Sequence, residues 1–205
     1  MISRRLILAA PLLLLALQST PASADIVSTK DALTDLVYGK ADAPVTIIEY
    51  ASLGCPHCAT FHEETFPKIK KAYIDTGKVR FIFRDFPLGA PALAAAMVSR
   101  CAGPKRHGGM VDLLFSSQRN WARAENPIDA IAMVARMGGL GPDDVQACIK
   151  NTELMQTLQA RAKEASDKNG INSTPSFLVN GTLISGSVPF EEFQKTIEAA
   201  LKKAK

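Results

Sequence analysis

Residues 45–58 read VTIIEYASLGCPHC, and this stretch decides how the chain folds. Its first six residues are β-branched or apolar apart from Glu49 and Tyr50, which predicts a buried strand. Residues 52–54 (SLG) then predict a turn. Because Cys55 and Cys58 open the next element, a Cys-x-x-Cys motif is expected where this strand ends and a helix begins.

The residues that follow complete a strand–helix–strand unit. Apolar residues recur at helical spacing from Pro56 until Thr76 and Gly77 end the pattern, and Pro67 predicts a kink in this helix. Residues 79–83 predict a second strand. Such a unit is right-handed and buries its parallel strands. We therefore expect an α/β domain that carries the cysteine pair directly after its first strand.

The rest of the chain is predicted to be helical and then to return to β structure. Residues 90–169 carry helical patterns broken by Gly and Pro turns, without a convincing strand, which predicts an all-helical insertion. Residues 176–179 and 182–185 predict two short strands joined by an Asn-Gly pair, the strongest two-residue hairpin signal, and an amphipathic helix follows. The expected division is an α/β domain of residues 25–89 and 170–205 with a helical insertion of residues 90–169.

Residues 1–24 predict a cleaved export signal. Arg4 and Arg5 precede an apolar run, and an Ala-x-Ala cleavage pattern ends at Ala24. A membrane anchor is the alternative, but the run is shorter than a span needs and contains Pro11. The paired arginines leave the export route open between general secretion and a twin-arginine pathway. Loss of the two arginines lowers the formal net charge from +4 to +2, too little to indicate a nucleic-acid partner.

Cys55 is the expected nucleophile. A Cys-x-x-Cys at a helix start places the first sulfur near unpaired backbone N–H groups and the positive end of the helix dipole, which favours the thiolate. His57 can donate a hydrogen bond or carry positive charge beside the same sulfur. Because a stabilised thiolate is a stabilised reduced form, the disulfide of such a pair is a strong oxidant.

Two other uses of the motif compete with redox chemistry. A zinc site needs further ligands, but Cys101 and Cys148 have no matching His or Cys at zinc-ligand spacing, and His62 is more simply a polar surface residue than a third ligand. A structural disulfide across so short a loop would constrain the unfolded chain little. Four cysteines in an exported chain favour disulfide chemistry, so no metal is expected.

With these motifs the chain resembles the DsbA family of thioredoxin-fold oxidases over essentially the whole region after residue 24. The matching segments are residues 49–58 with the Cys55-Pro56-His57-Cys58 centre, residues 81–87, the helical insertion, and residues 170–177 (GINSTPSF). The resemblance implies a thioredoxin fold with an all-helical insertion. It also implies a periplasmic thiol-disulfide oxidoreductase that introduces disulfides into reduced or unfolded exported proteins, needs no bound cofactor, and is recycled by a DsbB-type, quinone-linked membrane oxidase.

The resemblance further implies roles for individual residues. A substrate thiolate attacks Cys55, and Cys58 is the buried partner that re-forms the bond. Pro175 is expected to be cis and to lie opposite the cysteines, with the Thr174 backbone pairing an extended substrate segment. Glu49 falls at the position of a buried acid that can help to move the Cys58 proton.

Other features bear on the insertion and on the direction of the reaction. The resemblance is closest to the alphaproteobacterial DsbA subgroup, which has an extra cysteine pair; this implies a disulfide between Cys101 and Cys148, with two separate buried thiols as the alternative. Roughly 20 residues separate the cleavage site from the first strand, too few for a dimerisation region, so a monomer is expected. Thr174 before the proline also occurs in reductases and isomerases. A disulfide reductase or isomerase, or a chaperone-like binding protein, therefore stays an alternative.

Overall fold

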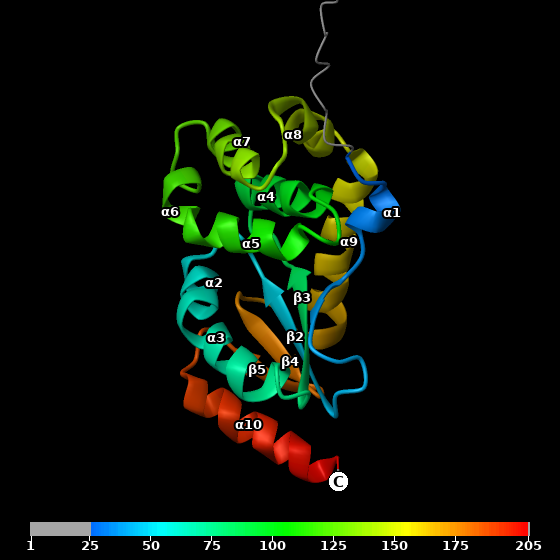
Figure 1. Ribbon diagram of the computed structural model, residues 1–205, viewed down its shortest axis with the longest axis vertical. Coiled ribbons are helices and arrows are strands. Elements are labelled where there is room, and N and C mark those ends of the chain that lie inside the picture. The colour runs from blue at the N-terminus through cyan, green and yellow to red at the C-terminus, as the bar shows by residue number, and fades with distance from the viewer. Residues whose placement is uncertain (1–25, 205) are drawn as a thin grey trace, which may run out of the picture.

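Residues 26–204 are the part of the chain that the computed structural model describes, and they contain a five-stranded mixed sheet (Figure 1). The strand order is β1-β3-β2-β4-β5; β2 and β3 are parallel, and the other neighbouring strands of this sheet are antiparallel. The strands span Leu36–Tyr38 (β1), Val45–Ala51 (β2), Val79–Asp85 (β3), Ser176–Val179 (β4) and Thr182–Ser185 (β5). The four predicted strands are therefore present, and β2 and β3 extend slightly beyond their predicted ends.

Successive side chains of β2 enter two different apolar clusters. Ile47 packs on one face of the sheet in a cluster that includes Phe61. Ile48 and Tyr50 belong to the opposite face, where they pack with Ala165. A strand that is buried on both faces is typical of parallel pairing and explains the nearly continuous apolar sequence of β2.

The helical segment that follows Cys55 runs through residues 56–74 and changes its hydrogen-bond pattern along the way. Pro67 has no N–H, and its ring would crowd a carbonyl of the preceding turn in a regular α-helix. A wider turn relieves this conflict: the N–H of Phe66 donates to the carbonyl of Phe61, five residues earlier. The irregularity expected at Pro67 thus takes the form of π turns. The segment comprises α2 (Pro56–Thr60), the π turn η1 (Phe61–Thr65), α3 (Phe66–Ile69) and the π turn η2 (Lys70–Ile74).

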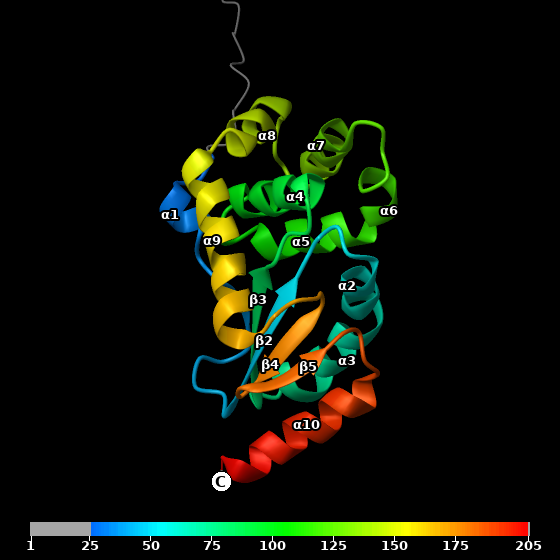
Figure 2. The ribbon, with the colours of Figure 1, turned by 180° about the vertical axis from the view of Figure 1, so that it is seen from behind.

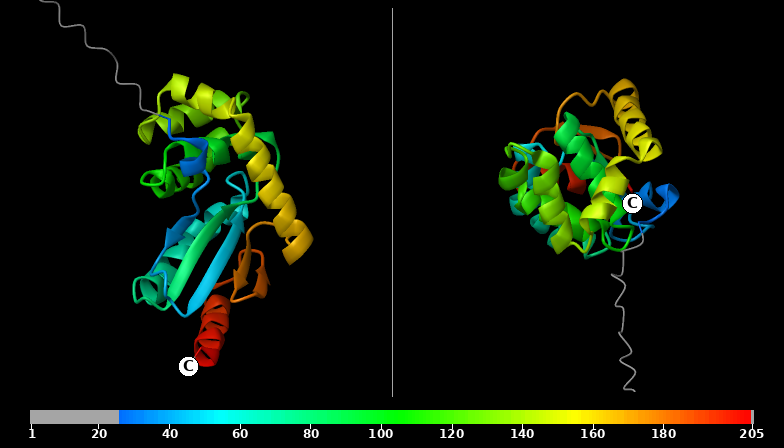
Figure 3. Two further views of the ribbon diagram at one scale, coloured as in Figure 1. Left: turned by 90° about the vertical axis from the view of Figure 1, so that its right-hand side faces the viewer. Right: turned by 90° about the horizontal axis from the view of Figure 1, so that it is seen from above.

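The predicted insertion is helical throughout and lies beyond the carboxyl ends of β2 and β3 (Figures 1 and 2). Its last helix, α9, leaves the insertion and runs along one face of the sheet, while α2 and α3 cover the other face (Figure 3). The C-terminal half of α9 therefore packs on the sheet. The helices are α4 (Ala90–Cys101), α5 (His107–Ser116), α6 (Gln118–Trp121), α7 (Pro127–Met137), α8 (Pro142–Ile149) and α9 (Thr152–Asn169).

The C-terminal part of the chain folds as a hairpin followed by a helix. Asn180 and Gly181 both have positive φ angles, 44° and 86°, as a type I′ hairpin turn requires. The helix α10 (Phe190–Lys203) places Phe193 and Ile197 in the same apolar cluster as Ile47. The predicted hairpin and amphipathic helix are thus both present.

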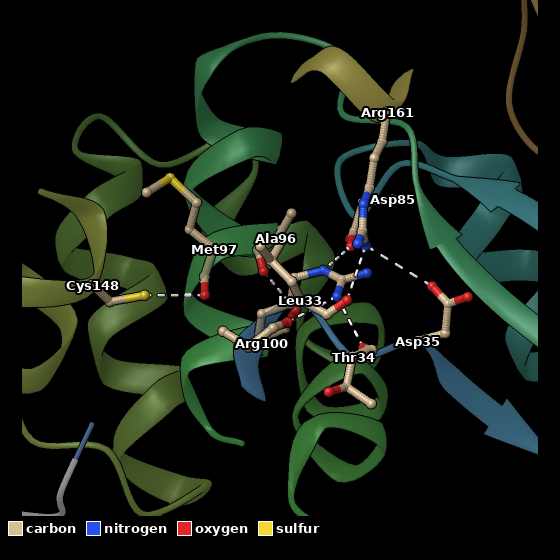
Figure 4. Close-up of polar contacts among 11 residues, drawn as sticks. Leu33, Thr34, Asp35, Asp85, Ala96, Met97, Arg100, Cys148 and Arg161 are labelled. Atoms are coloured by element: carbon tan, nitrogen blue, oxygen red, sulfur yellow. Dashed lines mark hydrogen bonds and ion pairs between the residues drawn. The ribbon is translucent and has the colours of Figure 1, made fainter. Parts of the chain in front are cut away.

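The segment before β2 contains two short elements that the sequence patterns do not reveal, α1 (Thr29–Ala32) and β1. β1 pairs with β3, and the buried Arg100 of α4 holds the chain between α1 and β1 (Figure 4). The guanidinium of Arg100 donates to the carbonyls of Ala32 at 2.9 Å and Thr34 at 3.2 Å, and its Nε donates to Asp85 at 2.5 Å. A side chain of the insertion therefore fixes the segment that leads into the edge strand β1.

Together these elements form a thioredoxin fold with an all-helical insertion between β3 and β4. Across residues 26–204, the helices are too short or too polar to cross a lipid bilayer. The export signal predicted for residues 1–24 lies outside the described residues.

Candidate active site

Cys55 begins the helical segment just after the carboxyl end of β2. Its N–H donates to the Ser52 carbonyl at 3.0 Å, which closes the predicted turn. Cys55 is the N-cap residue of α2, and Pro56 occupies the start of the helix, where the missing N–H of proline costs nothing. The carbonyl of Cys55 accepts the N–H groups of Cys58 and Ala59. Sγ of Cys55 is therefore held at a helix N-terminus.

The surroundings of Cys55 favour its thiolate. The Cys58 side chain is the main cause that lowers the pKa of Cys55 from its ordinary 9.0 to about 5, by a hydrogen bond to Sγ. Burial opposes the shift, whereas the Thr174 side chain and the backbone N–H groups of Cys58 and His57 add to it. His57 itself is exposed. Its contribution to this lowered pKa comes through its backbone N–H.

The surroundings of Cys58 favour the protonated thiol, in contrast to those of Cys55. It has no exposed surface, and burial is the main cause that raises the pKa of its thiol far above the ordinary value. The hydrogen bond to Cys55 and the charge of Glu49 raise this pKa further. A protonated Cys58 therefore faces an ionised Cys55, and only the first sulfur is a ready nucleophile.

Thr174 and Pro175 face the cysteine pair in space, although they lie more than 100 residues later in the chain. The peptide bond between them is cis, and both residues are buried beside the start of β4. Sγ of Cys55 lies 3.3 Å from the carbonyl oxygen of Thr174, so a protonated thiol can donate to this oxygen. The structure thus brings the two segments that the sequence singled out, residues 55–58 and 174–175, into contact.

Glu49 lies beneath the cysteines and has no exposed surface. His62 of η1 contacts it, with Nε2 at 2.8 Å from Oε2 of Glu49. The surface position predicted for His62 is wrong, because its side chain is only 5% exposed. Spacing is the signal that was missed: His62 follows Cys58 by four residues and therefore shares the buried face of the helix.

Gln118 is a further residue of the site that the sequence patterns do not reveal. Its side chain is buried, and Nε2 donates to the carbonyls of Leu53 at 2.6 Å and Cys55 at 2.9 Å. Gln118 begins α6, so the insertion supplies the donor that holds the active-site turn. A single glutamine far along the chain carries no motif from which this contact follows.

A groove of about 1050 Å³ borders the site, between the helical segment that starts at Cys55 and the insertion helices α5 and α6. Pro56 and Gln118 line it near the cysteines, and His62 lines it together with Phe115 and the exposed Asp112. The groove therefore connects the surroundings of Glu49 and His62 to solvent.

Cys101 and Cys148, the other cysteine pair, are joined by a disulfide between α4 and α8. Their Cα atoms are 6.2 Å apart, and both residues are buried in the core of the insertion. Sγ of Cys148 also lies 3.0 Å from the carbonyl oxygen of Met97 (Figure 4). This disulfide belongs to the insertion and leaves Cys55 and Cys58 as thiols.

Fold and site together define a class of protein: a thioredoxin fold with a Cys-x-x-Cys pair at a helix N-terminus, a cis-proline facing it, and a buried acid beneath it. In the part of the chain that the structure describes, no three His, Cys, Asp or Glu side chains gather as a set of metal ligands.

Comparisons with known proteins agree with this class. A family model described as "Thioredoxin" matches residues 31–199. A Rickettsia felis protein named "Putative protein-disulfide oxidoreductase" is 30% identical over 172 residues, which cover 83% of this chain and 62% of that protein. The crystal structure of alpha-DsbA1 from Wolbachia pipientis is 32% identical and has a TM-score of 0.77, covering 84% of this chain and 93% of that one. BdbD from Bacillus subtilis is 28% identical with a TM-score of 0.73, covering 85% and 95%.

The chain therefore belongs to the DsbA-like family of thioredoxin-fold proteins. It spans about 62% of the length of the first Rickettsia relative. The residues matched by the family model include both the cysteine pair and the Thr174-Pro175 segment.

Proposed function

We propose that this protein is a thiol-disulfide oxidoreductase that introduces disulfides into exported proteins through Cys55 and Cys58. The observation that carries the proposal is the asymmetry of the two thiols, because the pKa of Cys55 is lowered to about 5 while that of Cys58 is raised. An ionised Cys55 stabilises the reduced pair. The oxidised pair then passes its disulfide readily to a substrate.

The reaction proceeds through a mixed disulfide. A substrate thiolate attacks Sγ of Cys55 in the oxidised pair, the bond between Cys55 and Cys58 breaks, and its electron pair goes to Cys58, which takes up a proton. A second substrate thiolate then attacks the substrate sulfur of the mixed disulfide. Cys55 leaves as a thiolate, the substrate departs with a disulfide, and the two electrons remain in the reduced pair. Glu49 takes the Cys58 proton when the pair is oxidised again.

Substrate binding is assigned to Thr174 and Pro175, and their position beside Cys55 supports this. An extended segment of the substrate pairs with the backbone of Thr174 by strand addition, which depends little on the substrate's side chains. Pro56 and His57 are exposed on the same surface and contact the substrate next to its cysteine. This mode of binding suits an enzyme that acts on many unfolded or reduced exported proteins.

We assign the protein to the periplasm, as a monomer, with a DsbB-type quinone-linked membrane oxidase as the partner that re-oxidises it. The export pattern of residues 1–24 supports the compartment. The two electrons that each cycle leaves on Cys55 and Cys58 have to pass to an external oxidant, and a membrane oxidase of this type would accept them.

The test is the redox equilibrium of the Cys55–Cys58 pair with glutathione, in a chain with C101A and C148A so that one couple titrates. We expect a potential more oxidising than about −180 mV, the value typical of protein disulfide isomerase. The variant C55S in the same background is the control and should show no couple. A potential near about −180 mV would instead favour an isomerase, and one near about −270 mV, as in thioredoxin, a reductase.

A further inference from the structure

The buried carboxylate of Glu49 depends on one neighbour for its hydrogen bonding. It lies at 0% exposure in β2, and within residues 26–204 its Oε2 contacts Nε2 of His62 while its Oε1 has no hydrogen-bond partner. An ionised carboxylate in such a place is costly unless a donor supports it. His62 is the side chain placed to give this support.

The ring of His62 is held in place by aromatic neighbours. It stacks on Phe115 of α5, with ring centroids 4.4 Å apart and an angle of 26° between the planes, and it meets Phe66 and the edge of Phe83 at 5.2 Å and 5.8 Å. Nδ1 of His62 is buried without a hydrogen-bond partner among the described residues, so a neutral ring with its proton on Nε2 can donate to Glu49.

Few other titratable groups face this pair. Cys58 of α2 is affected by the charge of Glu49, Asp112 of α5 interacts electrostatically with His62, and the phenol of Tyr38 in β1 is affected by both acids. Burial raises the pKa of Asp112, and His62 opposes this rise. The cluster thus links the Cys58 thiol, through Glu49 and His62, to the groove.

We propose that His62 is a positioning residue: its Nε2–H hydrogen bond holds the Glu49 carboxylate in the orientation in which it can take the proton of Cys58. The inference rests on the proposed function, because the proton matters only if Cys58 undergoes thiol exchange. When Cys58 attacks a mixed disulfide at Cys55, its proton passes to Glu49 and its sulfur forms a bond to Sγ of Cys55. The bond from Cys55 to the substrate sulfur breaks, and that sulfur leaves as a thiolate.

The experiment mixes the reduced protein with dipyridyl disulfide, with which the two cysteines react one after the other. Attack by Cys55 releases one pyridinethione, and attack by Cys58 on the resulting mixed disulfide releases a second, so stopped-flow absorbance records two phases. Cys101 and Cys148 do not react with the reagent because they are already bonded to each other. The rates of both phases are measured as a function of pH.

His62→Phe keeps an aromatic ring on Phe115 but removes the donor. We expect its second phase to be about tenfold slower at neutral pH, as for partial loss of a general base, because the Glu49 carboxylate is no longer held toward Cys58. The first phase should keep its midpoint. His62→Gln restores an N–H donor and should recover most of the second-phase rate.

Three controls make the result specific. His107→Phe alters a second buried histidine, which packs near Phe83 but does not contact Glu49, and it should leave both phases unchanged. Glu49→Gln should slow the second phase, and adding H62F to it should cause no further loss, because the two residues act as one unit. If H62F does not fold, His62→Met fills the aromatic pocket without a donor and replaces it.

The outcomes distinguish the inference from the proposed function. A second phase with the same rate and pH profile in H62F as in the unmodified chain would overturn the role of His62. Additive losses from H62F and E49Q would also overturn it, since His62 would then act independently of Glu49. Absence of both phases from the unmodified chain would instead reject the redox function itself.

Discussion

Sγ of Cys55 and the carbonyl oxygen of Thr174 lie 3.3 Å apart, although 119 residues separate them in the chain. The register of the sheet produces this contact. In the antiparallel pair of β2 and β4, Tyr50 lies opposite Ser176, so continuing the register by two residues places Thr174 beside Ser52, in the turn that leads to Cys55. The site therefore exists only once the C-terminal strands have paired with β2.

The low pKa of Cys55 should appear directly in its reactivity. We expect the rate of Cys55 alkylation by iodoacetamide to rise with pH around a midpoint of about 5. Cys58→Ala removes the largest cause of the shift, so the midpoint should rise toward the ordinary value. A midpoint of the unmodified chain near 9.0, that of an unperturbed thiol, would contradict the assignment of Cys55 as a stabilised thiolate.

The same shift predicts how stability depends on pH in the reduced protein. The pKa of Cys55 is depressed on folding, so the unfolded chain binds more protons between about pH 5 and the unfolded value of 9.0. The free energy of unfolding should therefore rise with pH across this window. The stability that the Cys55 thiolate contributes decreases as pH falls from 9.0 and is gone once pH has fallen through about 5. Urea titrations of the reduced chain and of C55A as control measure it; parallel pH profiles for the two proteins would contradict the prediction.

Gln118 should matter for both the stability and the shape of the active-site turn. Gln118→Leu leaves the buried carbonyls of Leu53 and Cys55 without their donor, which should cost about 1–3 kcal/mol for an unsatisfied group. Urea unfolding measures this cost. Gln156→Leu, at an exposed position of α9, is the matched control and should change stability by less than about 0.5 kcal/mol. Equal effects of the two changes would refute the role of Gln118.

Breaking the buried ion pair of Arg100 and Asp85 should destabilise the protein far more than breaking an exposed ion pair (Figure 4). Arg100→Ala leaves the buried Asp85 without its ion-pair partner and removes the donors to the segment before β1, so we expect a loss of about 3–5 kcal/mol in the free energy of unfolding. Lys163→Ala breaks an exposed pair with Asp167 and should cost below about 1 kcal/mol. A small effect of R100A would mean that this contact does not anchor the N-terminal segment.

The disulfide in the insertion should be detectable and stabilising. Mass spectrometry of a non-reduced digest should find the peptides of Cys101 and Cys148 linked. Because the bond closes a loop with a sequence separation of 47 residues, replacing both cysteines by Ala should lower stability by about 2–4 kcal/mol in urea. Two alkylatable thiols at these positions in the oxidised protein would contradict the bond.

Local patterns in the sequence determined most of the fold. The apolar run of β2, the Asn-Gly hairpin turn and the helical spacing of the insertion each specify their own conformation, so these elements could be predicted. Short elements with few residues, α1 and β1, gave no such pattern, and their placement depends on Arg100 from a helix more than 60 residues away. Local propensity cannot report a contact of that kind.

The same division holds at the site. The sequence by itself determined where the reactive sulfur would be, because a Cys-x-x-Cys that follows a strand and opens a helix places Cys55 at the helix N-terminus whatever the rest of the chain does. Only the tertiary structure decided its surroundings: Thr174 reaches Cys55 through sheet register, Gln118 through docking of the insertion, and His62 through burial of one helix face against Glu49 and Phe115. The physical reason is that hydrogen bonding and burial depend on distance in space, which the spacing of residues along a chain does not fix.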